Sequence, residues 1–306
     1  MLERLDYVKL APRLIVDAGS GPAREAQALR QRYPGARLLA VDHALPMLRE
    51  ARPSGLGARV SRLLGRAGVQ PLCADLQALP LAAGCAQLLW SNMALHWMRE
   101  PRAALAEFHR VLAPGGLLMF STLGPDTLKE LRAAFASVDG YAHVNSFVDM
   151  HDLGDQLGAA GFTAPVMDAE TITLTYADVA GLMRDLRGSG QANCLAGRVR
   201  TLYGPRRWAR MCETLAGFVR EGRLPATAEV VYGHAWREAP RQSADGRAIV
   251  NCDTLARLFP EQSAIARPAW TIPVRSSRSG VRPKDSTCSS SATARFLLRD
   301  WPWPTP

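Results

Sequence analysis

The sequence predicts an α/β fold built on a mostly parallel β-sheet. Two observations indicate it. Short apolar runs alternate with segments of helical periodicity through the first half of the chain, and the first apolar run ends in a glycine turn that leads into a helix. Such alternation is typical of a parallel sheet covered by helices on both faces. With 306 residues, the chain has room for one large domain, or for one domain and an appendage.

The first half of the chain supplies five expected strands and three expected helices. Apolar runs predict the strands at residues 14–16, 37–41, 69–74, 87–90 and 117–121. Helical spacing, with proline in the first turn, predicts the helices at residues 22–33, 46–52 and 101–112. Pro34-Gly35 ends the first helix, and Pro114-Gly115-Gly116 makes the turn into the fifth strand.

The second half of the chain is expected to complete the sheet and to add a lid. Periodicity predicts helices at residues 125–138, 149–160, 178–187 and 205–221, and strands at residues 170–176 and 230–236. The alternation TITLTY indicates that the first of these strands is half-buried. We expect the late strands to form an antiparallel edge strand of the sheet and the intervening helices to form a helical lid insertion.

The domain boundaries follow from the same pattern. Residues 1–237 are expected to form one domain, with a core at about 12–123 and the lid and remaining strands at about 124–237. Residues 238–306 have the low-complexity composition of a disordered tail that takes no part in the chemistry.

Composition excludes several classes of protein. No apolar run approaches the roughly 18 residues that cross a bilayer, and the charged N-terminus is not a signal peptide. The six cysteines form no C-x-x-C pair and no Cys/His cluster, so we expect no metal site and a reducing cytoplasmic location. The net charge of +9 is not concentrated in the stripe of a nucleic-acid reader, although it could steer an acidic partner.

The strongest local motif is the glycine turn in LIVDAGSGPA, residues 14–23. Gly19 and Gly21 let the backbone approach a ligand closely, and the following helix offers free N–H groups. A dinucleotide site usually continues with a third glycine, where this chain has Arg24 or Glu25. S-adenosylmethionine instead carries a sulfonium and an amino group, which Asp17 at the strand end suits. The turn therefore favours S-adenosylmethionine over a nicotinamide cofactor.

Two further acids end the next two expected strands. Asp42 is expected to accept hydrogen bonds from both ribose hydroxyls, and Asp75 from the adenine amino group, while Leu76 supplies a backbone N–H to the ring. Ligands of parallel sheets bind at the carboxyl ends of the strands, where these acids and Asp17 should share one edge.

The fourth expected strand runs into the segment SNMALHW, residues 91–97. Asn92 is expected to line the pocket beside the methyl donor. For His96 and Trp97 we expect packing under the next helix, above all for Trp97.

Together, residues 17–21, Asp42, Asp75, the SNMALHW segment and residues 112–116 resemble the class I S-adenosylmethionine-dependent methyltransferases, whose sheet is Rossmann-like. Residues 121–132 (STLGPDTLKELR), 143–147 and 182–193 are similar to the malonyl-acyl-carrier-protein O-methyltransferases of biotin biosynthesis. The resemblance covers residues 2–236. It implies methylation of the free carboxyl of malonyl-phosphopantetheine on an acidic acyl carrier protein, or of malonyl-CoA. The ester lets fatty-acid enzymes extend the chain toward pimeloyl.

This reaction needs a cation more than a base. A carboxylate oxygen attacks the sulfonium methyl in line and is already a nucleophile at neutral pH, so proximity and desolvation supply the catalysis. Arginine is the natural partner for the malonyl carboxylate. The segments that carry the resemblance offer four candidate substrate-binding residues: Lys129, His143, Arg184 and Arg187. No catalytic residue is assigned.

Two alternatives stay open. The second half, including Asn193-Cys194, also resembles the mitochondrial complex I assembly factor, a methyltransferase-like protein, which implies arginine hydroxylation. Members of the methyltransferase family usually begin with a further segment that closes over the cofactor, whereas this sequence starts at MLERLDYVKL. That departure is compatible with a protein that binds S-adenosylmethionine without turnover.

Overall fold

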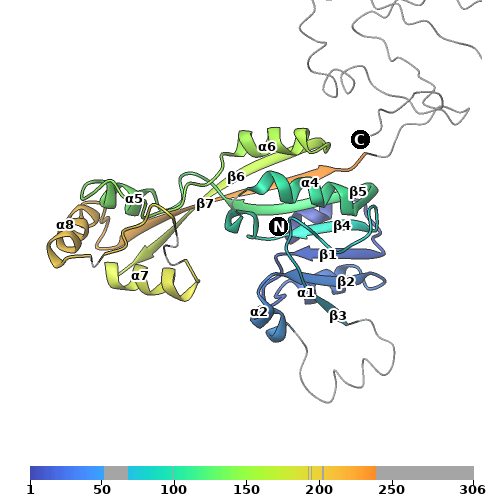
Figure 1. Ribbon diagram of the computed structural model, residues 1–306, viewed down its shortest axis with the longest axis horizontal. Helices are drawn as coiled ribbons and strands as arrows, with labels where there is room; N and C mark the ends of the chain where they lie inside the picture. Colours follow the sequence, from blue (N-terminus) through green and yellow to red (C-terminus); the bar gives the residue numbers. More distant parts are fainter. Residues whose placement is uncertain (52–67, 99, 192, 194, 202, 239–306) are drawn as a thin grey trace, which may run out of the picture. The chain divides into compact units, whose positions relative to one another are not determined.

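A seven-stranded sheet organises the part of the chain that the computed structural model describes, which is residues 1–51, 68–98, 100–191, 193, 195–201 and 203–238 (Figure 1). The chain divides into two units, residues 1–238 and 239–306. The second unit, and with it nearly all of the expected tail at 238–306, lies outside the described residues.

The strand order of the sheet is β3-β2-β1-β4-β5-β7-β6. The strands are β1 Leu14–Ala18, β2 Arg37–Asp42, β3 Val69–Cys73, β4 Ala86–Ser91, β5 Leu112–Leu123, β6 Thr163–Tyr176 and β7 Leu224–Trp236. The first five are parallel, and β7 runs antiparallel to both of its neighbours. The predicted mostly parallel sheet with a late antiparallel strand is confirmed. The antiparallel strand is β7, one position in from the edge that β6 forms.

Helices cover both faces of the parallel strands, as predicted. They are η1 Leu2–Tyr7, α1 Ala26–Arg32, α2 Leu45–Glu50, η2 Leu95–Trp97, α4 Pro101–Val111 and α6 Met150–Ala159. Successive strand residues enter different cores: Ile15 and Leu88 pack in one, Val16 and Leu89 in the other, and all four are buried. This follows from the alternation of side chains along a strand, and it explains the continuous apolar runs of the first half.

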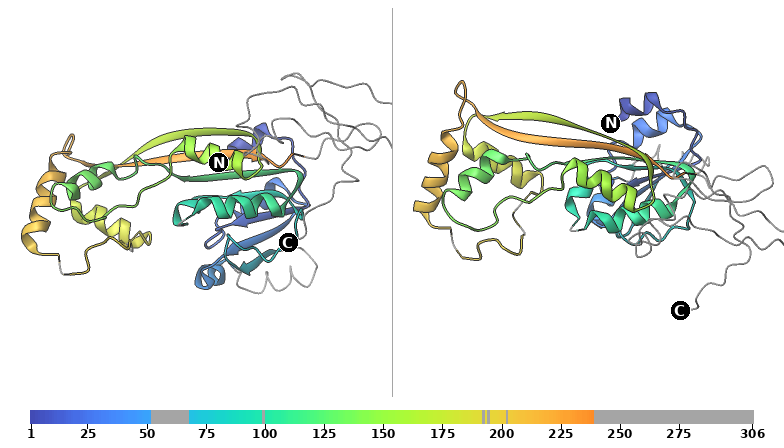
Figure 2. Two further views of the ribbon diagram at one scale, coloured as in Figure 1. Left: turned by 45° about the horizontal axis from the view of Figure 1, so that its top comes forward. Right: turned by 90° about the horizontal axis from the view of Figure 1, so that it is seen from above.

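The long β6–β7 ribbon was not predicted at its full length. The last β5–β7 pair joins Leu123 to Val230, whereas the β6–β7 pairing continues to Tyr176 and Leu224. The ribbon therefore extends past the carboxyl end of β5 (Figure 2). Residues 171–175, which we predicted to be half-buried, are all exposed, because this part of β6 lies beyond the main sheet.

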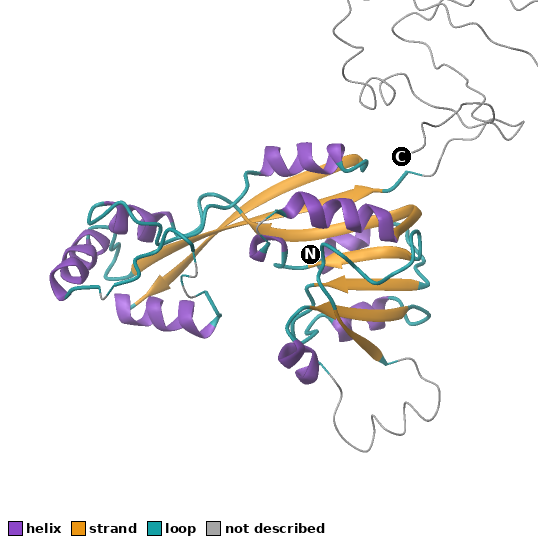
Figure 3. Ribbon diagram, viewed as in Figure 1, coloured by secondary structure: helices purple, strands orange, loops and turns teal. Residues whose placement is uncertain are grey.

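Three helices pack on the far part of the ribbon and form what we call the helical cluster. They are α5 Lys129–Ala136, α7 Val179–Gly188 and α8 Pro205–Ala216. Leu131, Leu182, Met211, Leu215 and Leu224 are buried together in a separate apolar core. The cluster thus has its own core, fixed to the sheet by the ribbon (Figure 3).

Helix boundaries match the expectations where capping residues mark them. Asp149 and Asp178 cap α6 and α7 by accepting hydrogen bonds from the backbone N–H groups of His151 and Gly181. Three helices are shorter than predicted. Residues 22–25 form a turn before α1, residues 125–128 precede α5 with Leu128 at a φ of 54°, and α8 ends at Ala216 before the turn into β7.

Candidate functional site

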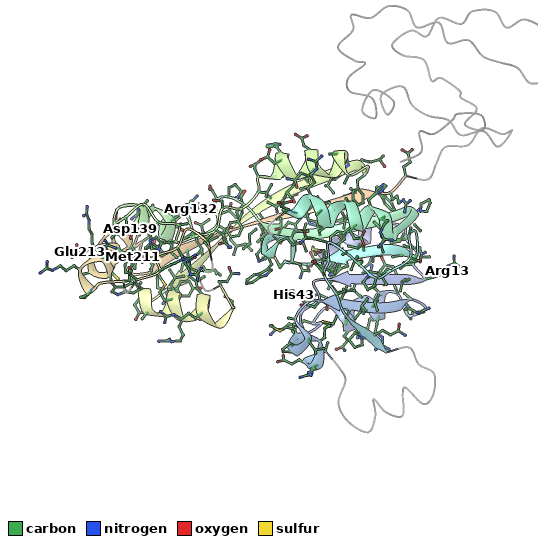
Figure 4. All side chains as sticks on the ribbon, viewed as in Figure 1. Arg13, His43, Arg132, Asp139, Met211 and Glu213 are labelled. Atoms are coloured by element: carbon green, nitrogen blue, oxygen red, sulfur yellow. The ribbon has the colours of Figure 1, made fainter. Side chains whose placement is uncertain are left out.

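Three of the predicted site residues meet at the carboxyl edge of the parallel sheet. Asp17 lies near the end of β1, paired with Ala40 of β2 and Trp90 of β4. Asp42 is the last residue of β2, and Asn92 follows β4 directly. Figure 4 shows His43, the neighbour of Asp42, at this edge and Arg13 at the opposite edge. The strand order, with β1 between β2 and β4, is what brings these residues together.

The glycine turn is held tightly against β2. The N–H groups of Gly19 and Ser20 donate to the carbonyl oxygen of Val41 at 2.8 and 3.0 Å. Gly19 has a φ of +78°, and a Cβ atom there would lie 2.2 Å from the Cβ atom of Ala94. Gly21 has a φ of +52°, with open space around its missing side chain. Only glycine fits the first position, whereas the second needs glycine for its backbone conformation alone.

Asp17 is a buried carboxyl group without a partner. Its side chain is 1% exposed, and Oδ2 accepts no hydrogen bond from any described residue. Burial, together with the negative charges of Glu25 and Asp42, raises the pKa of the Asp17 carboxyl to about 8. An unpaired buried carboxyl is unfavourable unless it serves a ligand. The Asp17 carboxyl is therefore suited to bind a positively charged group of a ligand, such as a protonated amine or another cation.

Asp42 both builds the turn and faces the site. Its Oδ1 accepts the N–H of Ala44 at 2.8 Å, and its Oδ2 accepts the N–H of Gly21 at 2.9 Å. A carboxylate oxygen can accept two hydrogen bonds, so each oxygen retains one acceptor position. Asp42 can thus fix the glycine turn and still accept hydrogen bonds from a pair of ligand hydroxyls.

Glu25 is a site residue that the sequence analysis missed. The Nδ2 of Asn92 donates to Oε1 of Glu25 at 3.0 Å, and Ser121 Oγ donates to Oδ1 of Asn92 at 2.6 Å. Ser121 of β5 thus holds the Asn92 side chain, and Asn92 in turn fixes the position of the Glu25 carboxylate. We call Asp17, Glu25 and Asp42 the acidic pocket; none of them forms an ion pair with a lysine or arginine of the described residues.

Asp75 and Leu76 differ in their environments. Asp75 is exposed and accepts the N–H of Gln77 at 2.9 Å, which makes a turn after β3. Leu76 is buried, and its Cδ1 would lie 3.5 Å from a Cβ atom at Gly19. The Leu76 side chain therefore packs against the glycine turn at Gly19. Its backbone N–H remains a candidate donor to a ligand.

The segment after β4 lies differently from the prediction. Trp97 is 54% exposed instead of packed under the next helix, and its ring reaches to within 3.8 Å of where a Cβ atom at Gly190 would be. His96 is largely buried, its Nδ1 has no partner among the described residues, and burial lowers its pKa to about 4. His96 lines a cavity of about 70 Å³ together with Thr122, Ser146 and Phe147. The cavity lies at the carboxyl end of β5, beside η2 and the start of α4.

The four candidate substrate-binding residues come from three segments of the chain. Lys129 begins α5, His143 lies in the segment between α5 and α6, and Arg184 and Arg187 lie one turn apart on α7. Lys129 is exposed and bonds Asp126 at 2.8 Å, and the His143 ring stacks on Phe135 with its Nε2 2.8 Å from Oδ1 of Asp139. Arg184 and Arg187 are exposed on α7.

Much of the distinctive STLGPDTLKELR segment has a structural role. Glu130 is buried and accepts both the N–H and the hydroxyl of Thr227 in β7, at 3.0 and 2.5 Å. Arg132 donates to the carbonyl oxygens of Pro125, Thr127 and Asn145, which ties the segment to residues 143–147. These contacts anchor the helical cluster to the ribbon.

Among the described residues, no group of three or more His, Cys, Asp and Glu side chains is placed to hold a metal ion. In the same part of the chain, no helix combines the length and apolarity that a membrane crossing needs.

The sequence is similar to known methyltransferases. The methyltransferase domain family matches residues 16–120, which span β1 to β5. The malonyl-[acyl-carrier protein] O-methyltransferase of Gallionella capsiferriformans is 50% identical over 250 residues, covering 82% of this chain and 86% of that protein. The enzyme of the same name from Laribacter hongkongensis is 53% identical over 254 residues, covering 82% and 85%.

Solved structures show the same fold. A protein from Bacillus halodurans C-125 and the YcgJ protein from Bacillus subtilis each give a TM-score of 0.54, at 15% and 13% identity. Each comparison covers 78% of this chain and 97% of the other. From its sequence relatives, the chain belongs to the malonyl-[acyl-carrier protein] O-methyltransferase family.

Proposed function

We propose that the protein transfers a methyl group from S-adenosylmethionine to the free carboxyl of a malonyl group carried by acyl carrier protein. The observation that carries the proposal is the acidic pocket at the carboxyl edge of a methyltransferase sheet, with the unpaired Asp17 at its centre. The family relationship supplies the acceptor.

The pocket fits a cationic cofactor. The cofactor would supply an electrophilic methyl group on a sulfonium. Asp17 and Glu25 would face its positive charges, and Asp42 would accept its ribose hydroxyls. A dinucleotide would instead place a pyrophosphate among the acidic side chains of the pocket, where negative charges repel each other. The electrostatics of the pocket therefore favour S-adenosylmethionine over a nicotinamide cofactor.

The chain has little chemistry to perform beyond holding the acceptor. A malonyl carboxylate is ionised at neutral pH, so alignment and exclusion of water account for the rate enhancement. The cavity beside His96 is the place that we assign to the malonyl group, because it lies at the carboxyl end of β5, on the sheet edge that also carries the acidic pocket. A neutral imidazole there can donate one hydrogen bond without adding a charge.

We assign the malonyl carboxylate to Arg184 and Arg187 ahead of Lys129 and His143. The latter two already have acidic partners in Asp126 and Asp139. Trp97 lies near Gly190, just after α7, so the end of α7 is close to the segment that follows β4. We infer that the helical cluster acts as the lid of the site, within one methyltransferase domain at residues 1–237.

The resulting methyl ester would mask the malonyl charge so that fatty-acid enzymes extend the chain toward pimeloyl for biotin. Malonyl-CoA is a second acceptor of the same chemistry. This role places the protein in the cytoplasm, where acyl carrier protein and S-adenosylmethionine occur.

A transfer assay tests the proposal. Purified protein, labelled S-adenosylmethionine and malonyl-acyl carrier protein are mixed, and the carrier is measured by intact mass. We expect a gain of one methyl group, which is lost in Asp42→Ala and reduced in Asp75→Ala, because the exposed Asp75 carboxylate after β3 would accept the adenine amino group. A gain of one oxygen on a peptide arginine would instead identify a hydroxylase. Cofactor binding without any transfer would identify a binding protein.

A further inference from the structure

The positive charge of residues 1–237 lies in one stretch. Residues 184–223 hold nine arginines and three acidic residues, a net charge of +6, whereas residues 1–237 as a whole carry +5. The stretch begins in α7, includes α8 and ends just before β7. The helical cluster is therefore basic, whereas the pocket at the sheet edge is acidic.

Three of these arginines lie in the first half of α8 without acidic partners. Arg206, Arg207 and Arg210 are exposed, and the side chain of none of them forms a hydrogen bond or an ion pair with another described residue. The first turn of α8 contains no acidic residue. Positive side chains near a helix N-terminus oppose the helix dipole. Helix stability therefore does not explain these arginines.

An apolar group lies among them. Trp208 is 39% exposed on the same helix, although α8 buries Met211 and Leu215 against the cluster core. A partly exposed tryptophan among arginines matches the composition of protein interfaces, where these two residue types are enriched at the points of strongest binding.

We propose that Arg206, Arg207, Arg210 and Trp208 of α8 form the docking surface for the acidic carrier protein that delivers the malonyl group. This inference rests on the proposed function, since the family name makes the acceptor a protein. Complementary charge would steer the carrier to α8 and fix its orientation. The ribbon holds the cluster beyond the carboxyl end of β5, the edge at which the acidic pocket opens. A carrier on α8 would present its flexible acyl arm from that side.

The test compares two triple variants with the same change in net charge. The first is Arg206→Glu, Arg207→Glu and Arg210→Glu. The control is Arg13→Glu, Arg30→Glu and Arg37→Glu, three exposed arginines away from the cluster, of which Arg13 lies at the opposite sheet edge (Figure 4). Acceptors are malonyl-acyl carrier protein and malonyl-pantetheine, which lacks the phosphates and the protein.

We expect the α8 variant to raise KM for malonyl-acyl carrier protein at least tenfold, with kcat at saturation unchanged. The control should raise it less than threefold, and neither should alter the kinetics with malonyl-pantetheine. Equal KM changes in both variants, or no change in either, would overturn the docking surface. If the wild-type protein methylates neither acceptor, the proposed function fails. Direct binding of the carrier to the three proteins, measured by fluorescence anisotropy, then still decides whether α8 docks it.

Discussion

The acidic pocket and the helical cluster carry opposite charge and are built in different ways. The pocket arises from strand ends and a left-handed glycine turn, and one of its carboxyl groups, that of Asp17, is buried with its Oδ2 unpaired among the described residues. The cluster arises from side-chain contacts between segments distant in sequence, such as Glu130 with Thr227, and it leaves its arginines exposed. The difference indicates a division of labour, in which the sheet edge binds a small cation and the cluster handles an anionic acceptor.

The largest effect is expected at Gly19. In Gly19→Ala the new Cβ atom would meet Ala94 at 2.2 Å in a left-handed backbone conformation. Overpacking of this kind typically costs about 1–3 kcal/mol, and the turn must shift to relieve it. We expect loss of measurable S-adenosylmethionine binding by calorimetry, together with a lower free energy of unfolding in urea.

Gly21→Ala is the matched control for that variant. Its φ is also positive, but nothing lies within 4 Å of the added atom. It should cost about 1 kcal/mol through backbone strain alone. Binding losses of the same size in both variants would mean that the tight approach of Gly19 to Ala94 is unimportant.

The second effect concerns Asp17. As pH rises, its titration should lower the free energy of unfolding and raise the affinity for S-adenosylmethionine. With a pKa raised to about 8, Asp17 keeps its proton in the folded ligand-free chain while the unfolded chain has lost it above pH 4. The unfolded state then binds fewer protons, so the contribution of Asp17 to the free energy of unfolding falls as pH rises from about 4 to about 8. Asp17→Asn should remove this fall and be more stable than wild type at pH 8.

The same substitution should weaken cofactor binding about 10- to 100-fold, because hydrogen bonds to a charged partner contribute about 1.5–3 kcal/mol. Wild-type affinity should rise with pH up to about 8, as the proton on Asp17 must leave for the cation to bind. Calorimetry across pH 6–9, beside urea unfolding at each pH, measures both trends. A wild-type affinity that does not depend on pH would contradict the assignment of Asp17 to the cation.

The contrast between the regions also explains what could be predicted from the sequence. The positions of Gly19, Asp42 and Asn92 at the carboxyl edge of the sheet could be predicted because a strand end and a glycine turn are local patterns, whereas their contacts with the cofactor stay a prediction. Glu25 was missed because its importance comes from a hydrogen bond to Asn92, 67 residues away. The first half of β6, residues 163–169, was missed because this edge segment is mostly exposed and its apolar residues do not alternate, so no hydrophobic period marks it.

The third prediction separates the two arginines of α7 from Lys129. Arg184→Ala combined with Arg187→Ala should raise KM for the malonyl acceptor about tenfold, the loss expected when a charge-assisted contact is removed. Lys129→Ala should change KM less than twofold, because that side chain is exposed and bonds Asp126. A larger effect at Lys129 than at the arginine pair would reverse the assignment.

The smallest effect is expected at His96, which lies between the two regions. Burial lowers the pKa of its imidazole to about 4, so the ring is neutral throughout the range in which the enzyme would work. His96→Gln keeps a neutral hydrogen-bonding group and should leave kcat/KM within about threefold of wild type, whereas His96→Leu removes the donor and should lower it about tenfold. The pH profile of kcat/KM between 5.5 and 8 should have the same shape in the wild type and in His96→Gln. An inflection near pH 6.5 that disappears in His96→Gln would mean that the imidazole becomes charged, and that the cavity is open to water or to the acceptor's own charge.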